Sequence, residues 1–211
     1  MEKREEPKKL IGVSGKMGSG KDTVGDIIRI LTSGVIVSNE TVQHTIKVST
    51  NITGWGSPWT IKKMAGKLKF IASILSGVPV FKFEDQEFKQ QKMDPEWGDL
   101  TYREFLQKIG TDALRDKVHE EIWANSLFVD QNHDSQWIVT DIRFPNEAEA
   151  IKKRDGILIR VNTTRECVAS NHASETSLDD YKDFDYVINN SGTIAELTSE
   201  IRGILVKENL M

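Results

Sequence analysis

Glycines and a lysine near the start of the chain have the types and spacing of a phosphate-binding loop. The segment 10–23 reads LIGVSGKMGSGKDT, and Gly15, Gly20 and Lys21 in it match the pattern G-x-x-x-x-G-K-[ST]. Backbone N–H groups of such a loop and the positive end of the following helix face an anion, and the lysine reaches the outer phosphates. The predicted phosphate contacts are Gly15, Lys16, Met17, Gly18, Ser19, Gly20, Lys21, Asp22 and Thr23.

The loop departs from the pattern at the position of its magnesium ligand. Asp22 stands where serine or threonine is usual, and Thr23 follows one place later. A carboxylate beside a polyphosphate is tolerable if it faces Mg²⁺ or the water shell of the ion. We therefore expect Mg²⁺ at Thr23 or Asp22, directly or through water.

A second group of chemically capable residues follows a buried-strand pattern at 137–141. The run Thr140-Asp141-Ile142-Arg143 ends that strand. Asp141 could orient magnesium-bound water or a substrate group, and Arg143 could clamp a phosphate through its two-pronged guanidinium. The alternative is a surface ion pair at a strand-to-helix turn. Lys21, Asp141 and Arg143 are the predicted catalytic residues.

Four residues between 65 and 125 are candidates for binding a substrate. Lys69 lies near the start of a predicted helix, where a cation opposes the helix dipole unless an anion is bound, although it could equally be a solvated lysine. Phe88 could stack on a base and Lys89 could meet a phosphate, or both could form an ordinary helix face. Trp123 could contact a ligand or belong to the core.

Strand and helix patterns alternate along the chain, which predicts a mostly parallel sheet covered by helices. A short strand at 35–37 and a hairpin over 38–57, with His44 as a solvated strand residue, are expected in between. Capping boxes begin helices after Thr101 and Thr193, and Pro145 opens another. In parallel sheets ligands gather where the strands end, and both the glycine loop and Asp141 fall there. The expected elements are strands at 10–13, 137–141, 156–161 and 185–189, and helices at 22–31, 66–76, 101–114, 120–129, 145–154 and 193–207.

Composition narrows the class of protein. The chain has 211 residues, 38% hydrophobic and 28% charged, with a net charge of −4. The length and composition suit one globular α/β domain. The negative net charge means that no overall electrostatic field attracts a nucleic acid. A single cysteine, Cys167, excludes an intramolecular disulfide and fits a reducing cytoplasm, and no apolar run is long enough for a membrane span. We expect a cytoplasmic protein with no nucleic-acid or membrane partner.

Taken together, these motifs resemble the bacteriophage-type deoxynucleoside monophosphate kinases over most of the chain. The likeness lies in the Gly-x4-Gly-Lys-Asp-Thr loop and in the order of several further segments. It implies a P-loop kinase fold, three-layer α/β/α with a mostly parallel sheet plus small substrate-binding and lid elements. It also implies transfer of the γ-phosphoryl of ATP to a deoxynucleoside monophosphate, with Mg²⁺, by a monomer or homodimer in the cytoplasm of a host cell. The further segments are 65–69, 83–89, 106–112, 123–125, 139–143, 172–175 and 183–188.

The resemblance also assigns parts of the chain. Residues 1–211 form one kinase domain, with an insertion and substrate-binding region at 38–100. The predicted substrate-binding residues are Lys69, Phe88, Lys89, Trp123, Asp141, Arg143 and Glu175. Part of the polar segment 162–183, which contains Arg165, His172 and Glu175, is expected to close over the bound nucleotide, because phosphoryl transfer needs water kept away. The alternative is a static surface connection between two strands.

Two other functions remain open at this point. Animal-type phosphomevalonate kinases look similar in the glycine loop, the strand-end Asp-x-Arg and the Asp-Phe-Asp strand. Aromatic residues within 81–92 favour a flat base over a purely basic pocket for that acceptor. A P-loop module that binds nucleotides without turnover is the third interpretation, and retention of Lys21, Asp141 and Arg143 argues against it. A serine hydrolase is disfavoured because no G-x-S-x-G elbow exists.

Overall fold

A computed structural model describes residues 9–48, 56–132, 134–164 and 173–211. The chain divides into two compact units. The first contains residues up to Lys62 and from Asn132 onward, and the second spans Lys63–Gln131.

The first unit is built on a five-stranded sheet in the order β2-β3-β1-β4-β5. All four neighbouring pairs are parallel, so every strand ends at the same edge. β1 is central, and Ser14 at its end pairs with Ile142 of β3 and with Arg160 of β4. The strands are β1 Leu10–Ser14, β2 Trp59–Lys62, β3 Gln136–Ile142, β4 Ile157–Asn162 and β5 Tyr186–Asn189.

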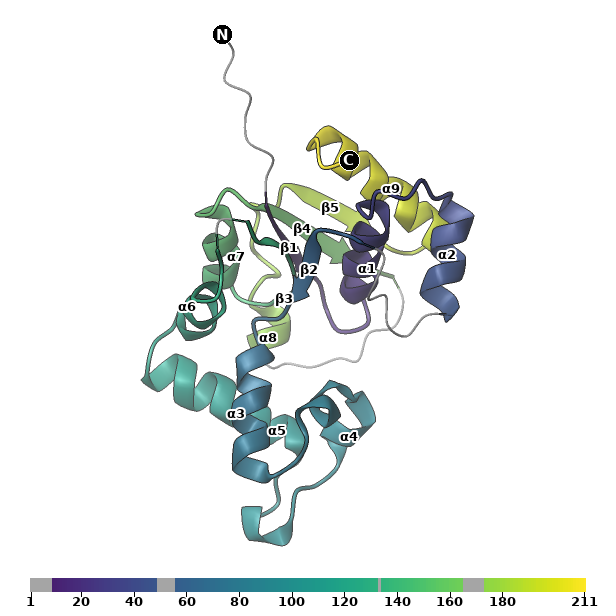
Figure 1. Ribbon diagram of the computed structural model, residues 1–211. Coiled ribbons are helices and arrows are strands. Elements are labelled where there is room, and N and C mark those ends of the chain that lie inside the picture. The colour runs from purple at the N-terminus through teal and green to yellow at the C-terminus, as the bar shows by residue number, and fades with distance from the viewer. Residues whose placement is uncertain (1–8, 49–55, 133, 165–172) are drawn as a thin grey trace. The chain divides into compact units, whose positions relative to one another are not determined.

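Helices cover both faces of this sheet, which gives the expected three layers (Figure 1). One face packs α1 (Lys21–Leu31) and α9 (Ile194–Lys207) in a core that includes the fully buried Ile27, Ile138 and Ile201. The other face packs α7 (Pro145–Lys152), where Ile151 approaches Gly12 of β1 so closely that a Cβ there would lie 3.0 Å from it. The α/β/α fold expected from the sequence is confirmed.

The region after α1 differs from the prediction. Residues 35–37 form no strand, and the first part of the expected hairpin is instead helix α2 (Asn39–Val48), on which His44 is an exposed helical residue. Residues 49–55 of that expected hairpin lie outside the described residues. Ser38 accepts a hydrogen bond from the Thr41 amide at its start, and Val42 and Thr45 are buried at helical spacing. Weak alternation in 38–48 was thus misleading, because α2 packs on α9 and buries one helical face. Strand β2 was not predicted.

The second unit is helical and has its own small core of Ala72, Phe83, Met93 and Phe105. α3 ends at Ser76 as predicted, and Gly77 after it adopts a left-handed φ of 71°. The capping box of Thr101 and Glu104 is also confirmed, but α5 is short and passes into a π-helix at Lys108. The elements are α3 Gly66–Ser76, the 3₁₀ helices Val80–Glu84 and Pro95–Trp97, α4 Gln86–Gln90, α5 Tyr102–Gln107, the π-helix Lys108–Arg115 and α6 Ile122–Phe128.

The π-helix makes a close contact that is testable by mutation. A Cβ at Gly110 would lie 2.6 Å from Leu68 Cδ2 on α3, so Gly110→Ala forces Leu68 to move. Overpacking of this kind typically costs about 1–3 kcal/mol, and we expect that loss in a urea melt. Gly203→Ala is the matched control, because nothing lies within 4 Å of its Cβ in α9. The control should be neutral or more stable than the wild type by roughly 0.5 kcal/mol. Equal stability of the two variants would contradict the packing argument.

The segment expected as a lid is described in part. It contains the end of β4, the short helix α8 (Ala173–Thr176) and the residues that lead to β5. Arg165, Cys167 and His172 lie outside the described residues. Among the helices that the structure describes, none has the length and apolar character to cross a membrane.

Candidate functional site

The glycine loop connects β1 to α1 and can be followed residue by residue. Gly18 and Gly20 have φ values of 84° and 94°, a region where side chains are strained. Gly15 is needed for a different reason: a Cβ there would lie 2.3 Å from Ser19 Oγ and 2.7 Å from the Val161 carbonyl oxygen. The loop therefore closes tightly on itself and on the end of β4, and α1 begins at Lys21 with its first N–H groups directed into the loop.

Asn190, which directly follows β5, also holds the phosphate loop in place. Its side-chain amide donates to the Ser19 carbonyl at 2.9 Å, and it is buried to 7% exposure. The sequence reasoning missed this residue, although its place after a buried strand of a parallel sheet was a usable signal. A cavity of about 280 Å³ lies next to it. The residues that line this cavity are Asn189, Asn190, Gly192, Thr193, Glu196, Leu197 and Glu200.

Gly20→Ala tests whether the loop shape is needed for nucleotide binding. The new Cβ would meet Asn190 Nδ2 at 2.4 Å, at a φ of 94°. We expect a loss of stability of about 1–2 kcal/mol from the backbone and weaker ATP binding by roughly tenfold or more. Gly34→Ala is the control, because Gly34 has a φ of 77° and no neighbour within 4 Å. It should lose similar stability and keep ATP affinity, as measured by calorimetric titration; equal loss of affinity in both variants would contradict a local role.

Lys21 and Asp22 begin α1 and point to different partners. Lys21 is only 7% exposed, and its Nζ lies 3.4 Å from the Lys16 carbonyl oxygen, against the loop. Asp22 Oδ1 accepts a hydrogen bond of 2.8 Å from Thr140 Oγ1 on β3, and Thr23 is half-buried. The bond from Asp22 to Thr140 joins the helix start to the neighbouring strand.

The donors at the helix start suit magnesium. Carboxylate and hydroxyl oxygens are hard ligands, and Mg²⁺ usually takes one or two of them together with water and substrate phosphates. Within the described residues no cluster of three or more histidine, cysteine or acidic side chains could form a complete metal cage. The roles of Asp22 and Thr23 as ligands stay predictions, and their chemistry fits the ion.

Asp141 and Arg143 lie at the end of β3, beside the phosphate loop, because Ile142 between them pairs with Ser14. Asp141 is 8% exposed. The turn that holds Arg143 is fixed by Glu147 of α7, whose Oε2 accepts from the amides of Arg143 at 2.9 Å and Phe144 at 3.3 Å. The sequence expectation that these residues and the glycine loop share one edge of the sheet is confirmed, and their catalytic roles stay predictions.

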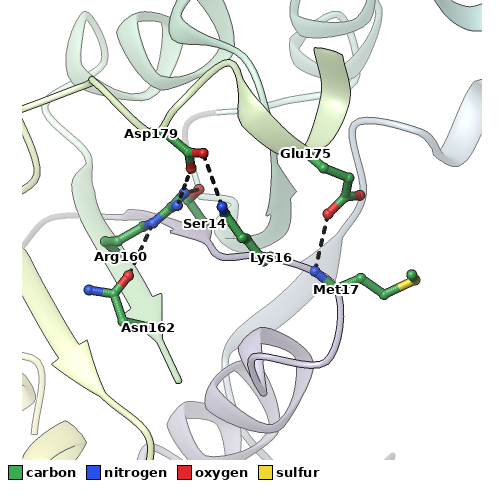
Figure 2. A network of polar contacts seen from close by, with 7 residues as sticks. All are labelled: Ser14, Lys16, Met17, Arg160, Asn162, Glu175 and Asp179. Carbon is green, nitrogen blue, oxygen red and sulfur yellow. Dashed lines mark hydrogen bonds and ion pairs between the residues drawn. The ribbon is translucent and has the colours of Figure 1, made fainter. Parts of the chain in front are cut away.

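Two carboxylates, Glu175 of α8 and Asp179 after it, reach the phosphate loop (Figure 2). Glu175 Oε2 accepts from the Met17 amide at 3.1 Å, and Glu175 Oε1 forms an ion pair with Arg143. Asp179 pairs with Lys16 at 3.0 Å and with Arg160 of β4 at 3.2 Å. Glu175 was among the predicted site residues, whereas Asp179 was not, because nothing in the polar run 176–183 distinguished it.

Arg160 was also missed. Its guanidinium donates to Ser14 Oγ at 3.1 Å and lies 3.4 Å from Asn162 Oδ1, and its side chain is 12% exposed (Figure 2). It also faces the ring of Phe184, 5.8 Å from the ring centre. An arginine at the end of a central strand, one strand away from the glycine loop, was a signal that the sequence reasoning did not use.

The stretch from Leu178 to Asp185, which contains Asp179 and leads to β5, is anchored to α7. Leu178 is buried to 4% exposure. The Tyr181 hydroxyl donates to Glu149 at 2.8 Å, and burial together with this bond raises the pKa of Tyr181. Lys152 pairs with Asp185 at 2.6 Å, which raises the pKa of Lys152. These contacts with α7 thus hold the segment that carries Glu175 and Asp179 in place beside the phosphate loop.

The remaining predicted substrate residues lie in the second unit. Lys69 pairs with Glu84 at 2.6 Å, and Phe88 stacks on Tyr102 with ring centres 4.4 Å apart. Lys89 is half-buried on α4. Trp123 is 5% exposed, and its indole N–H donates to the Gly110 carbonyl at 2.8 Å, an arrangement typical of a core residue. Their roles toward a substrate stay predictions.

The chain is similar in sequence to viral deoxynucleotide monophosphate kinases. A putative deoxynucleotide monophosphate kinase of Acanthamoeba polyphaga mimivirus is 29% identical over 206 residues, covering 91% of this chain and 93% of the relative. The deoxynucleoside-5'-monophosphate kinase of Escherichia phage T5 is 31% identical over 88 residues, which are 37% of this chain and 35% of that protein.

A solved shikimate kinase from Acinetobacter baumannii, in complex with shikimate, aligns with 97% of this chain and 96% of its own. Its TM-score is 0.46 at 16% sequence identity, a likeness that adds nothing to the arrangement of strands and helices described above.

A family model covers the whole of the second unit, the strands β2, β3, β4 and β5, and the carboxylates of Glu175 and Asp179. The model of the deoxynucleotide monophosphate kinases matches residues 59–201, which is more than half of the chain. The chain belongs to the deoxynucleotide monophosphate kinase family.

Proposed function

We propose that this protein transfers the γ-phosphoryl group of ATP to a deoxynucleoside monophosphate and releases ADP and the deoxynucleoside diphosphate. The observation that carries the proposal is the placement of Arg143 and Asp141 at the end of β3, paired through Ile142 with the strand that leads into the phosphate loop. Such a site has a cradle for the phosphates of the donor and a planar guanidinium for a second phosphate. The family of the chain supports this acceptor class.

The reaction needs positioning and charge neutralisation rather than a protein nucleophile. In the proposed step, an oxygen of the acceptor phosphate attacks the γ-phosphorus, and the bond to the β–γ bridging oxygen breaks, leaving ADP. Amides of residues 18–21 hold the β-phosphate, and Lys21 contacts β and γ oxygens. Arg143 binds the acceptor phosphate, while Asp141 orients it or a water molecule of the metal shell. Thr23 or Asp22 would hold Mg²⁺, directly or through water, and the bound ion would neutralise phosphate charge.

We also propose a place for the base of the donor nucleotide. The cavity beside Asn190 adjoins the loop through the bond from Asn190 to Ser19, and its lining combines the buried Leu197 with amide and carboxylate groups. A concave site with one apolar side chain and several hydrogen-bonding groups can hold a flat heterocycle and fix its orientation. Our candidates for binding the acceptor nucleotide remain Lys69, Phe88, Lys89 and Trp123. Glu175 remains a site residue. We further propose that the chain acts as one kinase domain, as a monomer or homodimer in the cytoplasm.

The test is a coupled ADP-release assay of the purified protein with ATP and Mg²⁺. Each deoxynucleoside monophosphate, each ribonucleoside monophosphate and phosphomevalonate is offered separately as acceptor. We expect ADP release that depends on one or more deoxynucleoside monophosphates, with the diphosphate product confirmed by chromatography. Turnover with phosphomevalonate alone, or binding of ATP without turnover on any acceptor, would overturn the proposal.

A further inference from the structure

Glu175 joins two parts of the site that are far apart in sequence. One carboxylate oxygen accepts from the Met17 amide in the phosphate loop at 3.1 Å, and the other pairs with the Arg143 guanidinium. The Glu175 side chain is 12% exposed, whereas that of Arg143 is 33% exposed. A single carboxylate therefore touches both the donor loop and the residue proposed to hold the acceptor phosphate.

This contact restricts where the guanidinium can lie. An arginine side chain has several rotatable bonds, and a charge-assisted pair with a fixed carboxylate selects one arrangement. The backbone of Arg143 is already held by Glu147, which accepts from its amide at 2.9 Å. With Glu147 at the base and Glu175 at the tip, Arg143 is constrained at both ends, and the Met17 amide ties that arrangement to the loop.

We propose that Glu175 is a positioning residue, which sets the place of the Arg143 guanidinium relative to the phosphate loop. The inference rests on the proposed function, in which Arg143 binds the acceptor phosphate. It gives Glu175 a role other than direct substrate contact: both carboxylate oxygens meet protein donors, and a carboxylate facing a phosphate would repel it. Misplacing a reacting group by even 1 Å can cost about a hundredfold in rate.

Asp179 keeps the same segment against the loop without touching Arg143 in any contact described above. It pairs with Lys16 and with Arg160, and Arg160 is tied to Ser14 at the end of β1 (Figure 2). Asp179→Asn therefore loosens the segment while leaving the pair of Glu175 and Arg143 intact. Comparing Asp179→Asn with Glu175→Gln therefore distinguishes an effect of holding the segment against the loop from an effect of positioning Arg143.

The experiment is a double-mutant cycle with Glu175→Gln and Arg143→Ala. Glutamine has nearly the shape of glutamate but one acceptor oxygen, so it can keep only one of the two contacts. The measurements are kcat/KM for the best deoxynucleoside monophosphate of the acceptor screen and the Kd of ATP without acceptor. We expect Glu175→Gln to lower kcat/KM about tenfold or more and to change the ATP Kd less than about threefold. In the Arg143→Ala background, the same substitution should lower kcat/KM by less than about twofold.

Several outcomes would overturn this inference. An equal loss from Glu175→Gln with and without Arg143 would mean that Glu175 contacts the substrate itself. Wild-type kcat/KM in Glu175→Gln, or the same non-additivity with Arg143 for Asp179→Asn, would also remove the positioning role. If Arg143→Ala alone has no effect, the proposed function of Arg143 fails as well; if it has a large effect and Glu175→Gln has none, only this inference fails.

Folding is checked by thermal melting, with Glu40→Gln on the exposed face of α2 as a surface control. Should Glu175→Gln melt more than about 5 °C below the wild type, Glu175→Asp replaces it in the cycle. Aspartate keeps the charge but is one methylene shorter, so it also cannot span both donors. The same loss of kcat/KM, absent in the Arg143→Ala background, is expected, and an additive loss would overturn the inference.

Discussion

Replacing Lys21 by alanine should lower kcat by about a hundredfold or more, equivalent to about 3 kcal/mol of transition-state stabilisation. Lys21 begins α1 and is 7% exposed, and its ammonium lies against the loop carbonyl of Lys16. In the proposed reaction this ammonium neutralises charge on the β- and γ-phosphates. Alanine removes the charge and also leaves a space at the helix start.

Steady-state assays of ADP release at saturating ATP and acceptor measure the effect. Lys21→Met separates charge from packing, because methionine fills a similar volume without an ammonium. Lys47→Ala, at the exposed end of α2, is the surface control and should keep wild-type kcat. A folded Lys21→Met enzyme with near-normal kcat would show that the lysine is not the phosphate contact.

Replacing Arg143 by lysine should lower kcat/KM for the acceptor by roughly a hundredfold, since one electrostatic donor of this kind is worth about 3 kcal/mol. Lysine keeps the charge but has no planar fork, so it cannot bind a phosphate oxygen pair and Glu175 in the same way. The loss should be larger for the acceptor than for ATP, because the acceptor phosphate is the group that Arg143 is proposed to hold.

Initial rates over a range of acceptor concentrations, with ATP saturating, give this ratio. Arg154→Lys is the matched control: Arg154 follows the end of α7 and donates to the Ala150 carbonyl at 2.9 Å. We expect it to be unchanged in rate. Wild-type kcat/KM in Arg143→Lys, with the protein folded by circular dichroism, would contradict the assignment of Arg143 to the acceptor phosphate.

Sequence reasoning predicted best those features whose interactions are local. The glycine loop was predicted because turn, helix start and lysine lie within nine residues, and positive φ at Gly18 and Gly20 follows from glycine itself. The capping boxes at Thr101 and Thr193 were predicted because their bonds join residues three apart. Parallel strands with helices between them also followed from alternating patterns along the chain.

Where local pattern and tertiary packing disagreed, packing decided. Residues 38–48 alternate weakly between polar and apolar, yet they form α2 because Val42 and Thr45 can be buried against the first unit only as a helix face. β2 is a strand of four residues whose identity depends on pairing with β3, and a segment so short has too little periodicity to be recognised alone.

By itself, therefore, the sequence determined that a phosphate loop, a strand-end Asp-x-Arg and a parallel sheet are present. Only the tertiary structure decided which side chains complete the site. The bond from Asn190 to the loop spans 171 residues, and that from Glu175 spans 158. Both form because the strand order puts β3 and β4 beside β1 and β5 beside β4, so that residues following separate strands meet at one edge. No local pattern encodes those meetings, since each partner is an ordinary polar residue until the sheet is assembled.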